Sequence, residues 1–500
     1  MQSQHYASLN PIEAYLGKER KDFSKQDLIK YITENEVRMV NFRYIAGDGR
    51  LKVLNFVIHT EEYLDDILSS GERVDGSSLF SFVEAGSSDL YVIPRYASAF
   101  MDPFAEEPTI SFLCSYFDKD GNPLESSPEY ILKKAHKTFA EVTGGMEFHA
   151  MGELEFYIIG EKPENFEAVD QKGYHEASPF NKFEQFRCEA MRLIAQVGGE
   201  IKYGHSEVGN FTLDDKVYEQ TEIEFLPVNV ERAAEQILLG KWVLFNLANA
   251  YGLNLTFAPK ITVGKAGSGM HIHTKIVKGS ENMYVKDGEL TEVAHKAIAG
   301  MLTLAPSLTA FGNTNPTSYF RLVPHQEAPT TVCWGDRNRS VLIRVPLGWN
   351  KKTDMLAMVN PSERGLEKDF SKKQTIEFRC PDGSADVYLL LAGLVVAATH
   401  GFEMGNAVEF AKNNYVSVNI HKDDVAATLT HLKHLPDSCM KSADELEKQK
   451  AVYSEHGVFS NFMLDAIIKR LRAYEDTNIR HAVETDKTLL QKMVDKYLYA

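Results

Sequence analysis

The sequence predicts an α+β fold, with a small β-rich domain at residues 26–122 and a large domain at residues 123–500. Two observations predict it. Strand-like runs dominate the first region, whereas strands and helices alternate in the second. Four strands of the second region also place apolar residues on one face and charged residues on the other. They are most simply arranged as one curved antiparallel sheet with a polar concave face. Residues 1–25 are predicted to form an N-terminal arm or short helix.

Composition excludes several classes of protein. The chain has 500 residues, of which 54 are basic and 70 acidic, giving a net charge of −16. Such an acidic balance argues against nucleic-acid and anionic-membrane partners. Five cysteines without metal-type spacing are typical of a reducing compartment. Neither a signal peptide nor an apolar run long enough to span a bilayer is visible, since the longest, 389–399, predicts a core helix. We therefore expect a cytoplasmic location.

The elements of the first domain follow from turn signals and alternation. Two strand-like runs at 37–45 and 51–58 flank Gly47-Asp48-Gly49, which predicts a β-hairpin. Short strands are predicted at 91–94 and 109–117. The segment Gly121-Asn122-Pro123 then breaks the pattern and marks the predicted domain boundary.

The second domain opens with a helix whose two ends can be read from the sequence. Ser127 is a good N-cap with Pro128 at the first helical position, and Gly144-Gly145 ends the helix. The elements predicted further along the chain are a helix within 181–199, a hairpin at 211–227 that turns at Asp214-Asp215, a long helix within 228–252, and peripheral helices in 404–500.

Four strands carry the strongest chemical signal. GELEF places two carboxylates on one face about 6–7 Å apart, with Leu154 and Phe156 on the other. The pattern recurs in TEIEF, MHIHTKI and TIEFRC, so the polar faces carry Glu153, Glu155, Glu222, Glu224, His271, His273, Lys275, Glu377 and Arg379. Carboxylates crowded on an interior face need cations. Oxygen ligands with one or two imidazoles favour Mg²⁺ or Mn²⁺ over zinc.

The alternative is an ordinary solvated sheet face, which is the commoner reading of any single E-x-E strand. Four such strands favour the metal site. A second constellation supplies positive charge through Arg321, Arg337, Arg339 and Arg344, with Glu327 among them. Arginine forks match carboxylate and phosphate oxygens, although surface ion pairs would give the same composition. Glycines 267 and 269 would let the backbone approach a ligand closely.

These motifs together resemble the glutamine synthetase family in its type I bacterial form. The resemblance rests on VDGSS, GELEF, QTEIEF, GSGMHIH, NPTSYFRLVPHQEAP, RNRSVLIRVP and IEFRCPDGSADVYL, which occur in the family's order from residue 74 to residue 389. HLPDSC and EHGVFSNF, which end at residue 462, are also similar to the family's C-terminal region. The resemblance implies a β-grasp first domain and a catalytic second domain whose curved sheet lines the active site.

The resemblance also implies a role for each matching residue. One metal would be held by Glu155, Glu207 and Glu222, and a second by Glu153, His271 and Glu377. Glutamate would contact Gly267, Arg321, Glu327 and Arg379; ATP would contact His273, Thr274, Lys275, Arg339 and Arg344. Asp75 and Ser78 would bind ammonium from a neighbouring subunit of a homododecamer built from two six-membered rings. Asp75, Glu327 and Arg339 would act in catalysis.

Three functions stay open at this stage. The first is ATP-dependent synthesis of glutamine from glutamate and ammonia, with two or more Mg²⁺ or Mn²⁺ ions per site. The second joins glutamate to another amine, because Ala266 stands where the family usually has asparagine. The third is a non-catalytic structural relative, which retention of all six metal positions disfavours. Glu207 precedes a hairpin that is longer than the one common in the type I family. Tyr415 lies in NNYVSVNI and not in the sequence that surrounds the family's regulatory tyrosine, so control by adenylylation is not expected.

Overall fold

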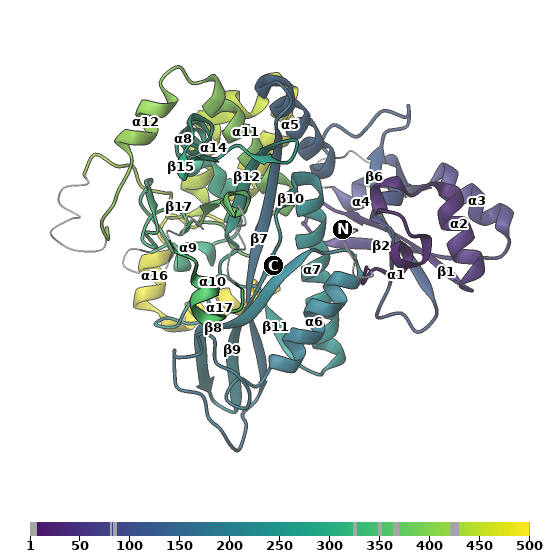
Figure 1. The fold of residues 1–500 in the computed structure, drawn as a ribbon, viewed down its shortest axis with the longest axis horizontal. Coiled ribbons are helices and arrows are strands. Elements are labelled where there is room, and N and C mark those ends of the chain that lie inside the picture. Colours follow the sequence, from purple (N-terminus) through teal and green to yellow (C-terminus); the bar gives the residue numbers. More distant parts are fainter. Residues whose placement is uncertain are drawn as a thin grey trace. The chain divides into compact units, whose positions relative to one another are not determined.

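The computed structural model describes residues 8–80, 83, 88–323, 328–348, 353–363, 370–420 and 430–499. The chain divides into two compact units that interleave along the sequence. Unit 1 is Met1–Ile131, Glu155–Leu226 and Ala234–Thr256; unit 2 is Leu132–Leu154, Pro227–Ala233 and Phe257–Ala500. The predicted α+β class is confirmed (Figure 1). The domain limits at residues 25/26 and 122/123 stay a prediction.

The N-terminal part of unit 1 is a six-stranded mixed sheet with the order β2-β1-β6-β4-β3 and β5 paired to β6. The predicted hairpin is confirmed, since β1 and β2 pair antiparallel from Met39↔Val57 to Ile45↔Leu51. Strand β1 also pairs in parallel with β6, which the sequence pattern did not predict. The elements here are α1 Pro11–Leu16, η1 Arg20–Asp22, α2 Lys25–Glu34, β1 Met39–Ile45, β2 Leu51–Val57, α3 Glu61–Ser70, β3 Glu72–Asp75, α4 Gly76–Leu79, β4 Asp89–Pro94, η3 Tyr96–Ser98, β5 Phe100–Met101 and β6 Thr109–Phe117.

Helices α2 and α3 lie side by side against this sheet and complete its core (Figure 1). Helix α2 begins with a capping box in which Ser24 and Asp27 satisfy each other's backbone amides. Its apolar stripe, Leu28 and Ile32, packs in one cluster with Phe42 of β1 and Phe112 of β6. The spacing of the apolar residues therefore determines both the helix and the face that it buries.

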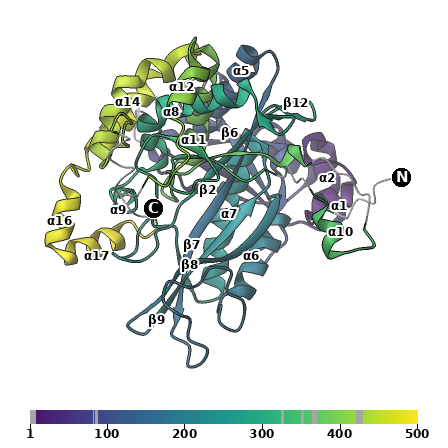
Figure 2. The same ribbon diagram turned by 60° about the vertical axis from the view of Figure 1, so that its left-hand side comes forward.

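The second sheet has ten strands, seven of them in the order β16-β17-β18-β12-β7-β9-β8. Strand β7, at Glu147–Glu161, runs from unit 2 into unit 1. Its first half pairs with β12, and β12 pairs with β18, all within unit 2. Within unit 1, β8 and β9 form the predicted hairpin, which turns between Leu213 and Lys216 (Figure 2). The bounds are β8 Ile201–Leu213, β9 Lys216–Phe225, β10 Val228–Asn229, β11 Asn254–Thr256, β12 Ile272–Lys278, β13 Glu281–Asn282, β16 Trp334–Asp336, β17 Ile343–Val345 and β18 Ile376–Phe378.

The helices after the first domain begin and end close to the predicted limits. Strands β14 Val285–Lys286 and β15 Glu289–Leu290 form a separate ribbon. The helices are α5 Pro128–Thr143, α6 Glu184–Gln196, α7 Val230–Ala250, α8 Glu292–Gly312, α9 Ser318–Arg321, α10 Met355–Val359, η4 Ser371–Lys373, α11 Val387–Glu403, α12 Ala407–Asn413, α14 Cys439–Ser454, η5 Glu455–Gly457, α15 Asn461–Arg472, α16 Ile479–Thr485 and α17 Lys487–Lys496.

Helices α8 and α11 form the core of unit 2. Both are apolar around their circumference, and α14 packs against α8 (Figure 2). The prediction of peripheral packing is therefore wrong for α14. Its Tyr453 is fully buried and its hydroxyl lies 2.7 Å from Ser307 Oγ of α8. The many charges of α14 hid the narrow apolar stripe that it buries.

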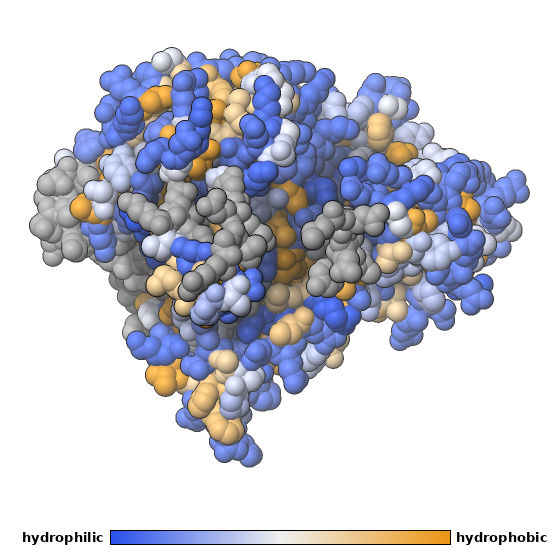
Figure 3. Space-filling view, viewed as in Figure 1, coloured by the Kyte–Doolittle hydropathy of each residue, from blue (hydrophilic) through white to orange (hydrophobic). Residues whose placement is uncertain are grey.

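Among the described residues, no single helix is long and apolar enough to span a membrane. Helices α11 and α12 reach the required length and composition only together, and they meet at an angle of 110°. Helix α11 is the core helix predicted from the apolar run at 389–399, and it is buried along most of its length. Hydrophilic residues cover most of the face drawn in Figure 3.

A buried carboxyl group anchors the segment before α6. Glu219 of β9 is 2% exposed and accepts hydrogen bonds from Asn181 Nδ2 at 2.8 Å and from the Lys182 amide at 2.9 Å. Burial raises the pKa of this carboxyl group from 4.5 to about 7, although those hydrogen bonds act to lower it. The folded state therefore binds a proton at Glu219 more tightly than the unfolded state does.

We expect the free energy of unfolding to fall as pH rises from 4.5 to about 7. The contribution of Glu219 is fully present below its unfolded pKa and is lost as pH passes the folded pKa, by up to about 3 kcal/mol. Denaturant titrations across this range measure it. Glu219→Gln should flatten the pH dependence, while the exposed Glu164→Gln should leave it unchanged. An identical pH dependence in Glu219→Gln and the wild type would refute the assignment.

Candidate active site

Carboxylates and imidazoles converge in unit 2 where β7, β12 and β18 lie side by side. Glu153 Oε1 lies 2.8 Å from His273 Nε2, and Glu153 Oε2 lies 2.9 Å from His271 Nδ1. The second carboxylate, Glu377 Oε1, lies 3.5 Å from His271 Nδ1. Ligand atoms of Glu153, His273 and Glu377 all lie within 4.8 Å of one another. Alternation along three neighbouring strands therefore brings four of the predicted residues together.

Both carboxylates are held in the charged form. Burial raises the pKa of Glu153, but the charge of His273 and the hydrogen bonds to His271 and His273 outweigh it, so the pKa lies well below its ordinary value. For Glu377, burial likewise raises the pKa and the Arg379 guanidinium more than offsets that effect. Buried carboxylates in this state require positive charge close by.

Two arginines supply part of that charge. Arg344 NH1 donates to Glu377 Oε2 at 2.8 Å, and Arg379 Nε donates to Glu377 Oε1 at 2.9 Å. Arg379 NH1 also donates to the backbone carbonyl of Arg339, which fixes its side chain. Arg344, one of the arginines of the predicted positively charged group, thus contacts Glu377 of the predicted acidic strands. Arg339 itself is exposed.

Arg321 is held against the glycine loop. Its NH1 donates to the carbonyl of Cys380 at 2.9 Å, and its NH2 lies 3.3 Å from His271 Nε2. A Cβ on Gly269 would lie 2.4 Å from Arg321 NH2, and one on Gly267 would lie 2.7 Å from the carbonyl of Pro259. Gly269 is therefore needed to admit the guanidinium, and Gly267 to admit the neighbouring backbone.

A second group of ligand atoms lies in unit 1, on the β8–β9 hairpin. His205, Glu207 and Glu222 place one atom each within 4.8 Å of one another. His205 lies directly opposite Glu222, and the register shifts between Ser206 and Asn210. This bulge lets His205 and Glu207 converge on Glu222 from one strand. Glu155 Oε2 accepts a hydrogen bond from Gln220 at 3.4 Å.

Three more contacts refine this second group. Glu224, predicted on the same face, pairs instead with Lys202 at 2.6 Å. The ring of His205 lies 4.4 Å from the ring of His175 and 5.6 Å from that of Tyr174. The imidazole of His205 is therefore flanked by the rings of Tyr174 and His175.

Sequence reasoning missed His205, although a signal was available. His205 and Glu207 stand two positions apart, the same spacing as His271 and His273, but the predicted hairpin begins only at residue 211, whereas β8 begins at Ile201. Thr375 was missed as well. Its hydroxyl lies 2.7 Å from His273 Nδ1 and orients the ring, a contact between strands that no local pattern indicates.

The remaining predicted residues are placed as follows. Asp75 is exposed and accepts hydrogen bonds from the hydroxyls of Ser77 at 2.7 Å and Ser78 at 2.8 Å, which lower its pKa to about 2. The side chain of Thr274 points to the opposite face of β12 from His273, into the core at Tyr284. Burial lowers the pKa of Lys275. Glu327 lies outside the described residues.

The donor sets of both groups fit divalent cations. Each combines carboxylate oxygens with imidazole nitrogen within the span of one coordination sphere. Hard oxygen donors with an imidazole suit Mg²⁺ or Mn²⁺. In unit 2 the charged carboxylates are already desolvated, so a bound cation would add attraction there without a further desolvation cost to them.

A small mixed sheet together with a large sheet that carries acidic strands is typical of a two-domain enzyme. Comparison with known proteins identifies the family. The profile of the glutamine synthetase catalytic domain matches residues 125–489, and that of the glutamine synthetase β-grasp domain matches residues 36–119. The chain therefore belongs to the glutamine synthetase family. Family membership supports an enzyme that acts as a glutamate ligase.

Individual relatives differ in the activity that their names give. A 3-hydroxylaminophenol mutase of Cupriavidus pinatubonensis is 30% identical over 92% of this chain and 98% of its own length. A glutamine synthetase of Frankia alni is 28% identical over 91% of this chain and 96% of its own length. The Plasmodium falciparum glutamine synthetase structure is 18% identical, with a TM-score of 0.71 over 92% of this chain and 97% of that one, and shows the fold alone.

Proposed function

We propose that this protein joins ammonia to the γ-carboxylate of L-glutamate with ATP, through γ-glutamyl phosphate, to give L-glutamine, ADP and phosphate. The observation that carries this proposal is the convergence of Glu153, His273 and Glu377 on one point in unit 2. A carboxylate is a poor acyl donor to an amine until phosphorylation gives it a leaving group. A site for that reaction must hold nucleotide phosphates beside an acidic substrate, which requires concentrated positive charge.

Mg²⁺ or Mn²⁺ would be held by Glu153, His271 and Glu377, with His273 adjoining. A second ion would be held by Glu155, Glu207 and Glu222, with His205 adjoining. Such ions would neutralise phosphoryl oxygens and lower the barrier to transfer. Strand β7 carries Glu153 and Glu155 two residues apart, so each proposed ion would take one ligand from this strand.

Side chains of unit 2 would position the transferring group. Arg344 donates through NH1 to Glu377, while its Nε is buried and has no hydrogen-bond partner among the described residues. A buried donor without an acceptor is costly, so a phosphate oxygen is the acceptor that we assign to it. Arg339 would add charge at the exposed edge. Arg379 and Arg321 would orient glutamate.

Asp75 would bind ammonium with Ser78. Its carboxylate is kept charged by two serine hydroxyls, as a cation-binding group must be. The proposed assembly is a homododecamer in which Asp75 serves the site of a neighbouring subunit. Glu327, which lies outside the described residues, would complete the cation site and exclude water from the acyl phosphate.

A second candidate is ligation of an organic amine. Ala266, in place of the family's usual asparagine, is buried and contributes no polar group from its side chain. The rings of Tyr174 and His175 lie against the ring of His205 and would pack against an alkyl or aryl group. The 30% identical hydroxylaminophenol mutase adds an aromatic hydroxylamine to the compounds worth testing.

ATP-dependent phosphate release should separate the candidates. We expect the highest kcat/KM with glutamate and ammonium, and weaker turnover with methylamine, a polyamine or an aniline. Higher kcat/KM with an organic amine would favour the second candidate. Isomerisation of 3-hydroxylaminophenol without ATP would contradict both. Sedimentation of the same preparation tests the assembly, because an active monomer is incompatible with a site completed by Asp75 of another subunit.

A further inference from the structure

Helix α16, near the C-terminal end of unit 2, contacts the short helix that carries Arg321. The two helices, α16 and α9, lie side by side (Figure 1). Arg480, in the first turn of α16, donates from Nε to the carbonyl of Tyr319 at 2.9 Å and from NH2 to the carbonyl of Leu322. These two carbonyls stand on either side of Arg321 in the sequence. One side chain from a distant part of the chain therefore brackets the backbone of Arg321.

The carbonyls at the end of α9 need donors from outside the helix. Helix α9 is a single turn, Ser318–Arg321, so its last carbonyls have no partners within it. The guanidinium fork of Arg480 reaches two of these carbonyls at once, and hydrogen bonds from a charged donor are stronger than neutral ones. Arg480 thus fixes the orientation of the turn as well as its place.

The guanidinium of Arg321 is held at its other end by groups of the candidate active site. Its NH1 donates to the carbonyls of Cys380 at 2.9 Å and Pro381 at 3.2 Å. Its NH2 donates to the carbonyl of Arg379 at 3.3 Å and lies 3.3 Å from His271 Nε2. Several of these contacts are long, so a small displacement of the α9 backbone would break them. The orientation of Arg321 therefore depends on the place of its own turn.

Helix α16 is anchored by contacts other than those of Arg480. Asp476, three residues before the helix, accepts hydrogen bonds from the amides of Cys439 at 2.8 Å and Met440 at 3.1 Å, at the start of α14. Val483 of α16 is buried. Removal of the Arg480 guanidinium should therefore release α9 while α16 stays in place.

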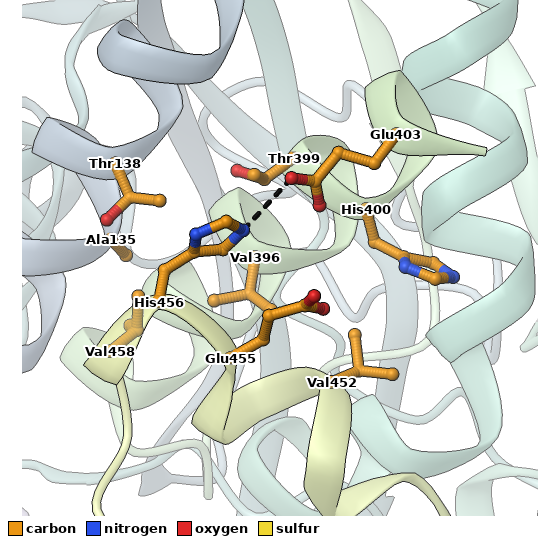
Figure 4. Close-up of a pocket in the computed structure, with 10 residues that line it drawn as sticks. All are labelled: Ala135, Thr138, Val396, Thr399, His400, Glu403, Val452, Glu455, His456 and Val458. Carbon is orange, nitrogen blue, oxygen red and sulfur yellow. Dashed lines mark hydrogen bonds and ion pairs between the residues drawn. The ribbon is translucent and has the colours of Figure 1, made fainter.

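The turn between α14 and α15 provides another anchor for the C-terminal helices. His456 Nε2 lies 3.0 Å from Glu403 Oε1, at the end of the core helix α11 (Figure 4). Val458, which follows in the chain, is 2% exposed. The C-terminal helices thus dock on unit 2 at several points, and Arg480 is the contact that reaches the helix of Arg321.

We infer that Arg480 is a positioning residue, which holds the α9 turn so that Arg321 meets the substrate carboxylate in one fixed orientation. This role rests on the proposed function, in which Arg321 orients glutamate. Arg480 acts through the backbone of α9 and not on the reacting atoms. Its loss should weaken the binding of glutamate equally in the ground state and the transition state, which raises KM and leaves kcat unchanged. ATP is assigned to other residues, so its KM should not change.

Initial rates of phosphate release, with glutamate and then ATP as the varied substrate, measure this separation. We expect Arg480→Ala to raise the KM for glutamate about tenfold, while kcat and the KM for ATP change by less than about twofold. Arg480→Lys should recover part of the loss, because an ammonium group can donate to one carbonyl but lacks the fork. Arg472→Ala is the matched control. This arginine of α15 bonds to Asp444 at 2.7 Å and Glu447 at 2.6 Å on α14, and its loss should leave both KM values unchanged.

Hydrogen exchange of backbone amides tests the same role without turnover. In Arg480→Ala the amides of Leu322 and Val323, which close the α9 turn, should exchange faster than in the wild type. The amides at the start of α14 that donate to Asp476 should keep their protection, because α16 stays in place. Arg472→Ala should leave the exchange of the α9 turn unchanged.

The outcomes separate the role of Arg480 from the proposed function. An unchanged KM for glutamate in an active Arg480→Ala variant would overturn the positioning role alone, as would an equal rise in both KM values. Loss of protection at the start of α14 would also overturn it, because Arg480 would then hold α16 and not α9. A wild type that releases no phosphate with glutamate would instead reject the proposed function, and the exchange result would still decide whether Arg480 holds the turn of Arg321.

Discussion

Replacing Glu377 by glutamine is expected to lower the rate of phosphoryl transfer roughly a thousandfold. The side chain is 2% exposed and accepts hydrogen bonds from Arg344 and Arg379. Glutamine keeps the shape but removes the charge, and its amide group would face one of the two guanidinium donors. A divalent cation would lose an oxygen ligand, and both arginines would lose their counter-charge.

The same substitution is expected to cost stability, which the measurement must separate from catalysis. Arginine cannot release its proton, so a lost partner leaves buried charge, at a cost of about 3 kcal/mol or more. Glu153→Gln avoids this problem because its partners His271 and His273 are imidazoles and not guanidinium groups. We expect Glu153→Gln to lose activity to a similar extent while it unfolds near the wild-type denaturant concentration.

ADP formation in a single turnover with glutamate and ATP measures transfer directly. Sedimentation and circular dichroism of each variant establish that the assembly and fold are intact. The exposed Glu281→Gln, on β13 of the same sheet, is the matched control and should retain full activity. Turnover close to wild type in both Glu153→Gln and Glu377→Gln would eliminate the cation account of the site.

Gly300→Ala is expected to destabilise the protein by about 3 kcal/mol or more. Helices α8 and α11 are in close backbone contact at two glycines, one on each helix. A Cβ on Gly300 would lie 1.8 Å from the carbonyl of Ala397, and one on Gly401 would lie 2.0 Å from the carbonyl of Lys296. In both cases the atom that would have to move is backbone of a buried helix. Alanine normally stabilises a helix relative to glycine, so contact between the helices outweighs propensity here.

The effect should extend to the site, because the ends of these helices support it. The Asp382 amide donates to the carbonyl of Gly312 at the end of α8, and Asn313 Nδ2 donates to the carbonyl of Cys380 at 2.8 Å. The carbonyl of Cys380 also accepts a hydrogen bond from Arg321. Separating the helices would displace these contacts. We therefore expect Gly300→Ala to reduce activity as well as stability.

Denaturant unfolding of Gly300→Ala against the wild type measures the effect. Gly405→Ala is the matched control, since a Cβ there has no atom within 4 Å and the glycine does not have a positive φ. That variant should be neutral or slightly stabilising. Equal unfolding midpoints for Gly300→Ala and the wild type would show that the helices can separate at little cost.

The sequence by itself determined which residues share a face of a strand. The sequence predicts that Glu153 lies on one face of its strand and Leu154 on the opposite face. The structure is consistent with this prediction, because Leu154 is fully buried. The limits of helix α5 could also be predicted from the sequence, at Ser127 and Gly144. These features depend on the fixed periods of strands and helices and on caps and turns, all of which are local. The resemblance to the glutamine synthetase family rested on the same strand motifs, which occur along the chain in the family's order.

Only the tertiary structure decided which residues of those faces meet. Glu222 lies beside His205, whereas Glu224, two residues further on, pairs with Lys202. The register between β8 and β9 and its bulges make that choice. Alternation fixes the direction of each side chain, but its partner depends on strand pairing, and pairing is set by burying the whole sheet against its helices. For the same reason, the parallel pairing of β1 with β6 could not be predicted from either strand alone.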